Sequence, residues 1–197
     1  MRARRVQLRA LPVAEPAAPT LVLVGAPNVG KSSLVRLLSS GVPEVCNYPF
    51  TTRSIQMGHF FVGSDRHVVT DTPGLLARAD AERNRMERLT LISLEHLPAA
   101  VLFVCDPTGG SGTSLPDQLA VRAELRGRFP GRPWLDVLSK ADAMHPGAPP
   151  PAGLDGALRV SAVTNAGVDA LREAVVILMA VRKSKAEPGA LASAAGG

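Results

Sequence analysis

The segment Gly25–Ser32 restricts the possible folds of this chain more than any other stretch of its sequence. It reads Gly-Ala-Pro-Asn-Val-Gly-Lys-Ser and matches the pattern G-x-x-x-x-G-K-[ST] without departure. The apolar run Leu21–Val24 precedes it, and leucines at helical spacing follow it from Leu34 onward. Glycines let a backbone turn so that successive N–H groups face one anion, and a helix start adds partial positive charge. The order of strand, loop and helix therefore predicts a phosphate-binding loop.

Strand-like and helix-like segments alternate between residues 20 and 182. The predicted strands cover 21–24, 54–62, 66–70, 100–105, 134–138 and 158–161, and a turn at Gly63-Ser64-Asp65 makes the second and third a hairpin. Helices are predicted after the phosphate loop, over 83–97 and 115–127, and from 168 onward, and prolines make 143–156 a loop. This alternation predicts an α/β fold, a three-layer P-loop NTPase domain with a mostly parallel six-stranded sheet and one antiparallel strand.

Composition excludes several classes of protein. Hydrophobic residues make up 46% and charged residues 20% of the 197, which is typical of a globular chain and not of a disordered one. The longest uninterrupted apolar run, Ala174–Val181, is too short to cross a bilayer, so we expect no membrane partner. Two cysteines are too few for a disulfide framework.

The positive charge is concentrated at the two ends of the chain. The formal net charge is +5, yet residues 10–181 contain 15 basic and 16 acidic residues. We therefore divide the chain into a basic N-terminal arm over 1–19, a nucleotide-binding domain over 20–182 and a disordered tail over 183–197. Basic arms on a neutral body predict contact with RNA or another polyanion, and solvated terminal charge is the alternative.

Residues around the phosphate loop have the chemistry that a nucleoside triphosphate and its metal require. Lys31 supplies a charge to the β- and γ-phosphates, and Ser32 places a hydroxyl on Mg²⁺. The tetrapeptide Asp71-Thr72-Pro73-Gly74 begins 40 residues after Lys31, at the end of a predicted strand. There the Asp71 carboxylate can hold Mg²⁺, directly or through water, and the Gly74 N–H can meet the γ-phosphate. Helix capping is the alternative role for Asp71.

Two later segments point to guanine as the base. In Ser139-Lys140-Ala141-Asp142 the Asp142 carboxylate can accept the N1–H and 2-amino hydrogens of guanine, which adenine lacks. The stem of Lys140 can lie over the base, and Ser161-Ala162 can offer a backbone N–H to the guanine oxygen. A surface ion pair is the alternative for Lys140 and Asp142. Since all these segments follow strands, where open α/β sheets bind ligands, the set predicts GTP rather than ATP.

The constellation resembles the translation-factor-related small GTPases, and within them the Obg-like group and the nucleolar GTP-binding protein 1 family. The segments that carry this resemblance, beside the motifs above, are 11–21, Asn47–Thr52, Asp71–Leu76, Arg83–Arg85 and His96–Leu102, within a similarity over about residues 11–182. The resemblance implies a GTPase that forms GDP and phosphate, slowly without an activator, and works in large-subunit ribosome assembly. It implies GTP or GDP, Mg²⁺ and K⁺ as ligands.

The resemblance also assigns roles to individual residues. It implies that nucleotide is contacted by Gly25, Asn28, Val29, Gly30, Lys31, Ser32, Ser33, Asp71, Gly74, Ser139, Lys140, Asp142, Ser161 and Ala162. The metal would be held by Ser32, Asp71 and the switch I threonine, which is Thr52 or else Thr51. The residues expected to act in catalysis are Lys31, Thr52, Gly74 and Asn28. Asn28 would help to hold K⁺, and shaping the phosphate loop is its alternative role.

The implied partner is a pre-ribosomal particle with its rRNA, bound through the basic ends. The family's name places it in the nucleolus, and an organelle (chloroplast or mitochondrion) or the cytoplasm is the alternative, the Arg/Ala-rich start being similar to a short transit peptide. We expect no DNA partner and a monomeric state. The family carries further regions before and after its GTPase domain, so the chain is either a fragment or a minimal relative.

Two departures from the family pattern bear on activity. Ser139 stands where the guanine motif usually has Asn, so we expect weaker nucleotide binding with guanine preference retained through Asp142. Leu75 stands where many small GTPases have a water-orienting Gln, which predicts slow or assisted hydrolysis. A non-hydrolysing scaffold that only loads nucleotide is the competing function, and an Obg- or Era-like GTPase of another pathway is a further one.

Overall fold

The computed structural model describes residues 19–47, 54–97 and 99–186 of the chain. The predicted basic arm, apart from its last residue, lies outside the described residues, and so do residues 187–197 of the predicted tail. Thr51 and Thr52 also lie outside them, so their proposed role in metal binding stays a prediction.

A single seven-stranded sheet forms the middle layer, in the order β2-β3-β4-β1-β5-β6-β7. Its strands are β1 (Thr20–Val24), β2 (Glu44–Asn47), β3 (Ser54–Val62), β4 (Asp65–Thr70), β5 (Ala99–Cys105), β6 (Trp134–Leu138) and β7 (Leu158–Arg159). All neighbours pair parallel except at β3, which runs antiparallel to both β2 and β4. The predicted mostly parallel sheet with one antiparallel strand is confirmed.

The predicted number of six strands is wrong because Glu44–Asn47 adds the edge strand β2. Its four residues begin and end with polar side chains, so they lack the apolar run that marks the central strands. β2 pairs with β3 alone, in the register Glu44↔Met57 to Asn47↔Ser54. At the other edge β7 ends at Arg159, two residues earlier than predicted.

In the described part of the chain, four α-helices cover the sheet, as the sequence predicts. They are α1 (Lys31–Leu38), α2 (Arg85–His96), α3 (Leu115–Arg128) and α4 (Val168–Ala186), with 3-10 turns at Asp80–Glu82 and Ala141–Ala143. α2 begins with a capping box, in which the Asn84 side chain accepts from the Glu87 N–H and the Glu87 carboxylate accepts from the Asn84 N–H.

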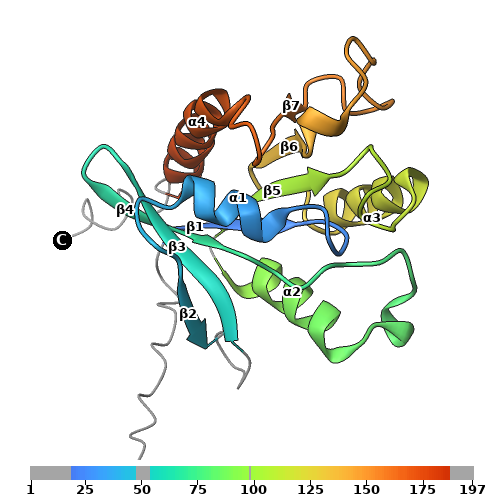
Figure 1. The fold of residues 1–197 in the computed structure, drawn as a ribbon. Coiled ribbons are helices and arrows are strands. Elements are labelled where there is room, and N and C mark those ends of the chain that lie inside the picture. The colour runs from blue at the N-terminus through green and yellow to red at the C-terminus, as the bar shows by residue number, and fades with distance from the viewer. Residues whose placement is uncertain (1–18, 48–53, 98, 187–197) are drawn as a thin grey trace, which may run out of the picture.

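The helices bury two separate apolar layers, one on each face of the sheet (Figure 1). Alternate residues of β1 point to opposite faces, so Leu21 and Leu23 join the layer under α1 and α4, while Val22 and Val24 join the layer under α2 and α3. β1 is therefore buried on both sides, and the loop that follows it leaves from the centre of the sheet. Among the described residues, none of the helices combines the length and apolar character needed to cross a bilayer.

Candidate functional site

The loop between β1 and α1 has the tight backbone that its sequence predicts. Gly25, Asn28 and Gly30 all have positive φ, at 148°, 59° and 97°. A Cβ on Gly25 would lie 2.3 Å from the carbonyl oxygen of Val104 in β5, so only glycine fits there. Asn28 is exposed at the bend, where asparagine tolerates the left-handed conformation. The loop thus curls over the end of β5 and leads directly into α1.

Lys31, the first residue of α1, is buried beneath this loop, with 6% of its surface exposed. Its Nζ donates to the carbonyl oxygens of Ala26 at 2.7 Å and Gly25 at 3.3 Å. Burial lowers the pKa of the Lys31 ammonium to about 8, and the nearby negative charge of Asp71 opposes that shift. Among the described residues the Lys31 ammonium donates to carbonyl oxygens and not to a carboxylate, so it is suited to receive a charged phosphate oxygen.

Ser32 and Asp71 meet beside Lys31. The Ser32 hydroxyl donates to Asp71 Oδ2 at 2.5 Å, and Asp71 is held after β4 by its own N–H, which donates to the carbonyl of Gln56. The other carboxylate oxygen, Asp71 Oδ1, is buried and accepts no hydrogen bond from the described residues. A hydroxyl and a carboxylate with an unused oxygen are hard donors of the kind Mg²⁺ prefers, so the residues present fit that ion.

The segment after Asp71 packs directly on the phosphate loop. A Cβ on Gly74 would lie 2.5 Å from the backbone nitrogen of Pro27, and the N–H of Leu75 donates to the Gly25 carbonyl at 3.0 Å. The Leu75 side chain is fully buried in the layer under α2 and α3. It therefore points into the core rather than toward the loop.

These residues enclose a cavity of about 440 Å³, within the usual range for a small-molecule site. Its walls are Pro27, Asn28, Gly30, Lys31, Ser32, Ser33, Asp71, Thr72 and Gly74. Seven of the nine are residues that the sequence assigned to nucleotide contact. The two remaining loop residues of that assignment, Gly25 and Val29, are buried behind the wall.

A second cluster forms at the ends of β6 and β7. Ser161 is fully buried, and its hydroxyl donates to Asp142 Oδ1 at 2.5 Å, while the N–H of Ala141 donates to the Val160 carbonyl. Asp142 and Ala162 are both exposed. The segments 139–142 and 161–162, predicted to share one base, therefore lie side by side.

The two clusters meet at Gly30 and Ser139, where a Cβ on Gly30 would lie 3.9 Å from the Ser139 Cβ. Ser139 is buried, but its hydroxyl donates to the carbonyl oxygen of Cys105 at 3.1 Å. The Ser139 hydroxyl therefore ties the base-binding loop to β5 and makes no hydrogen bond to the phosphate loop among the described residues.

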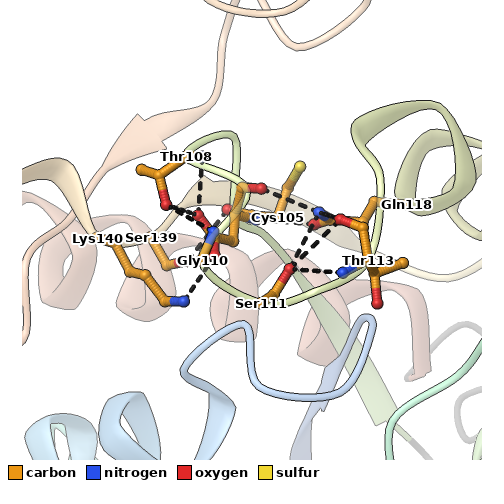
Figure 2. Close-up of polar contacts among 9 residues, drawn as sticks. Cys105, Thr108, Gly110, Ser111, Thr113, Gln118, Ser139 and Lys140 are labelled. Carbon is orange, nitrogen blue, oxygen red and sulfur yellow. Dashed lines mark hydrogen bonds and ion pairs between the residues drawn. The ribbon is translucent and has the colours of Figure 1, made fainter. Parts of the chain in front are cut away.

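Sequence reasoning missed one residue beside the second cluster. Asp106, which follows β5, is fully buried, and its Oδ2 accepts from Lys140 Nζ at 2.6 Å (Figure 2). Its position directly after an apolar strand is the same signal that identified Asp71, so the sequence contained a way to find it.

Comparison with known proteins agrees with this geometry. The model of a family described as 50S ribosome-binding GTPase matches residues 20–133, more than half of the chain. The chain belongs to this family. The match begins at β1 and covers the phosphate loop and Asp71.

Individual members confirm the resemblance to nucleolar GTP-binding protein 1. The protein of that name from Caenorhabditis elegans is 38% identical over 147 residues, 75% of this chain and 22% of the relative. A crystal structure carrying the same name, from Plasmodium falciparum, has a TM-score of 0.70 at 25% identity and covers 89% of this chain and 93% of that one. The cytosolic domain of FeoB from L. pneumophila, with a TM-score of 0.65 at 24% identity over 81% of this chain and 68% of that chain, shares the fold. The chain spans about a fifth of the length of the curated relatives it matches.

Proposed function

We propose that this chain is the GTP-hydrolysing switch domain of a protein that acts in assembly of the large ribosomal subunit. The observation that carries the proposal is that two clusters meet at Gly30 and Ser139. One would bind phosphates and a metal, and the other would bind the edge of a base. The family description names the 50S ribosome, and relatives are named nucleolar GTP-binding protein 1. The proposed partner is accordingly a pre-ribosomal particle with its rRNA, and the proposed location is the nucleolus.

At the phosphate end, the backbone N–H groups of residues 25–31 and the Lys31 ammonium would bind the β- and γ-phosphates. Gly74 lies against the loop at Pro27, and its N–H would sense the γ-phosphate. Loss of that phosphate would free residues 72–85 to move, and such movement changes the affinity of a GTPase for its partner.

Ser32 and Asp71 would hold Mg²⁺, with Thr52 or Thr51 as the third protein ligand. When bound, the ion neutralises the charge that develops between the β- and γ-phosphates. The unused Asp71 Oδ1, buried beside the Ser32 hydroxyl, supports this assignment because a buried carboxylate oxygen needs a partner.

At the base end, Asp142 would select guanine. The Ser161 hydroxyl fixes one carboxylate oxygen, and the carboxylate remains exposed to accept hydrogen bonds from the base edge. The N–H of Ala162 would donate to the guanine oxygen. Calorimetric titration of the chain with GDP and ADP tests this directly: we expect a clear preference for GDP, and equal affinities would contradict the proposal.

Hydrolysis must proceed without help from residue 75, because the Leu75 side chain lies in the core. Asn28 is exposed at the bend of the phosphate loop and lines the cavity, and it would hold K⁺ near the phosphates. A cation at that place supplies positive charge to the transition state. We expect faster GTP turnover in KCl than in NaCl, and equal rates in the two salts would exclude this role.

The buried Leu75 also favours the second candidate function, a scaffold that loads GTP without cleaving it. Single-turnover assays with Mg²⁺ and K⁺, with and without ribosomal particles, separate the two functions. Phosphate release above that of a Lys31→Ala control identifies the switch enzyme. Release no higher than the control under all these conditions identifies the scaffold.

A further inference from the structure

Asp106 is the most completely buried carboxylate beside the base-binding loop, and both of its oxygens have partners. Oδ2 accepts from Lys140 Nζ at 2.6 Å, and Oδ1 accepts from the N–H and the hydroxyl of Thr108 at 2.9 and 2.6 Å (Figure 2). Burial opposes the charge of Asp106, but the bonds from Lys140 and Thr108 outweigh it, so the pKa of the carboxyl lies below its ordinary value. The group is an anion at neutral pH and pairs with a cation.

The position of Asp106 is fixed through its backbone by α3. The buried side chain of Gln118 accepts from the Asp106 N–H at 2.8 Å and donates to the Asp106 carbonyl at 2.9 Å. The same Gln118 amide also donates to the Thr113 carbonyl at 2.9 Å, so residues 106–113 are closed into one hydrogen-bonded loop (Figure 2). The carboxylate that Lys140 contacts therefore belongs to a rigid part of the molecule.

The ion pair with Asp106 fixes the Lys140 side chain, which the preceding residue, Ser139, does not contact through its hydroxyl. The Ser139 hydroxyl bonds to the Cys105 carbonyl and makes no bond to the phosphate loop among the described residues. Lys140 itself has a left-handed backbone, with φ of 55°, which is uncommon for a residue other than glycine. The direction of its side chain is thus determined by the ion pair with Asp106 rather than by a regular element.

We infer that Asp106 is a positioning residue for the nucleotide base: it holds the Lys140 ammonium so that the stem of this side chain lies along the base plane. Ser139 ties the backbone of the base-binding loop to β5 at Cys105, and the ion pair adds a second tie, from the Lys140 side chain to the residue that follows β5. The inference rests on the proposed function, since it concerns the same guanine nucleotide. It separates two tasks, with Asp142 reading the base edge and Asp106 acting through Lys140 on the base face.

The two tasks predict different effects on two ligands, GDP and inosine diphosphate, which lacks the 2-amino group that Asp142 would read. In the full chain, Asp106→Asn should weaken both ligands by the same factor, about tenfold. Asp142→Ala should instead reduce the difference between the two ligands. A Lys140→Met variant keeps an apolar stem and loses the charge, so Asp106→Asn should cause no further loss of GDP affinity in that background.

Asp136→Asn is the matched control for loss of a half-buried ion pair. Asp136 lies in β6 and accepts from Arg122 Nε at 2.8 Å and Nη2 at 2.7 Å, outside both halves of the candidate site. We expect it to lower the thermal unfolding midpoint and leave GDP affinity unchanged. If Asp106→Asn binds GDP as the parent chain does, or weakens it no more than Asp136→Asn, the inference is wrong while the proposed function stands. If the parent chain itself shows no preference for GDP over ADP, the proposed function fails first.

Discussion

The hydroxyl of Ser32 and the carboxylate of Asp71 lie 2.5 Å apart although 39 residues separate them in the sequence. The contact joins the start of α1 to the end of β4, because β1 and β4 are parallel neighbours whose carboxyl ends meet at one edge of the sheet. The first prediction follows from this pair.

Replacing Asp71 by Asn should weaken Mg²⁺ binding and leave nucleotide binding without metal largely intact. The amide keeps the size of the side chain but removes the charge that faces the ion. Mg²⁺ should increase the affinity for GDP. We expect the Mg²⁺ concentration that gives half of this increase to rise about 10–100-fold in the variant, as is usual when the residues around a metal are altered. Titrations of a fluorescent GDP analogue with MgCl₂, against EDTA, measure this, with the exposed Asp155→Asn as control. An unchanged Mg²⁺ midpoint would remove Asp71 from the metal site.

The affinity for GDP should fall as the pH rises above about 8. Because the pKa of Lys31 is lowered to about 8 in the free chain, the ammonium loses its proton above that pH. A bound phosphate favours the charged form of Lys31 and therefore raises this pKa again. Binding then takes up a proton, and the affinity should drop about fivefold between pH 8 and pH 9. Calorimetry in buffers of different ionisation enthalpy measures the proton uptake.

The Lys31→Met variant, which has no amine to titrate, provides the control for that pH profile. The GDP affinity that remains in this variant should change with pH only through the titration of the guanine base and of groups other than Lys31. A parent profile parallel to that of Lys31→Met would show that the Lys31 proton plays no part in binding.

Leu75→Gln should destabilise the fold rather than accelerate hydrolysis. The side chain is fully buried under α2 and α3, so an amide there loses apolar packing and lacks hydrogen-bond partners, at a cost of about 2–4 kcal/mol in the free energy of unfolding. Urea denaturation measures the loss, and single-turnover GTP hydrolysis should not increase. Ala77→Gln, at an exposed position two residues later, should change stability by less than about 0.5 kcal/mol. A faster Leu75→Gln enzyme of parental stability would mean that residue 75 leaves the core during catalysis.

Glu87→Ala should loosen the segment that follows Gly74. The buried Glu87 carboxylate accepts from the Leu76 N–H at 3.1 Å and from the Asn84 N–H at 3.0 Å, and pairs with Arg78 at 3.4 Å. Its removal should cost about 1–3 kcal/mol of stability and speed hydrogen exchange over residues 74–80. Exchange measured by mass spectrometry tests this, with the exposed Glu82→Ala as a control of equal charge change. Equal exchange in the two variants would contradict the role of Glu87.

The sequence was a good guide to the site wherever a backbone motif carried the chemistry. The phosphate loop, Asp71 and Asp142 could be located because each follows a strand, and parallel strands bring such positions together. The directions of side chains could not be predicted from the sequence. No local pattern shows that Leu75 enters the core. Nor does one show that the Ser139 hydroxyl bonds to Cys105 or that Lys140 pairs with Asp106. These depend on neighbours 34 residues away for both Ser139 and Lys140. The edge strand β2 was missed because its four residues begin and end with polar side chains and lack an apolar run.

Glu87 divides its two oxygens between two structures, Oε1 serving the loop at Leu76 and Oε2 serving the first turn of α2 at Asn84. If the segment at Leu76 moves away, Glu87 loses one of its two backbone partners. The carboxylate that caps α2 at Asn84 is then held less firmly. Loss of a phosphate at the loop would then loosen α2 at Arg85, on the face of the sheet opposite α1 and α4, so that the two faces respond to one event.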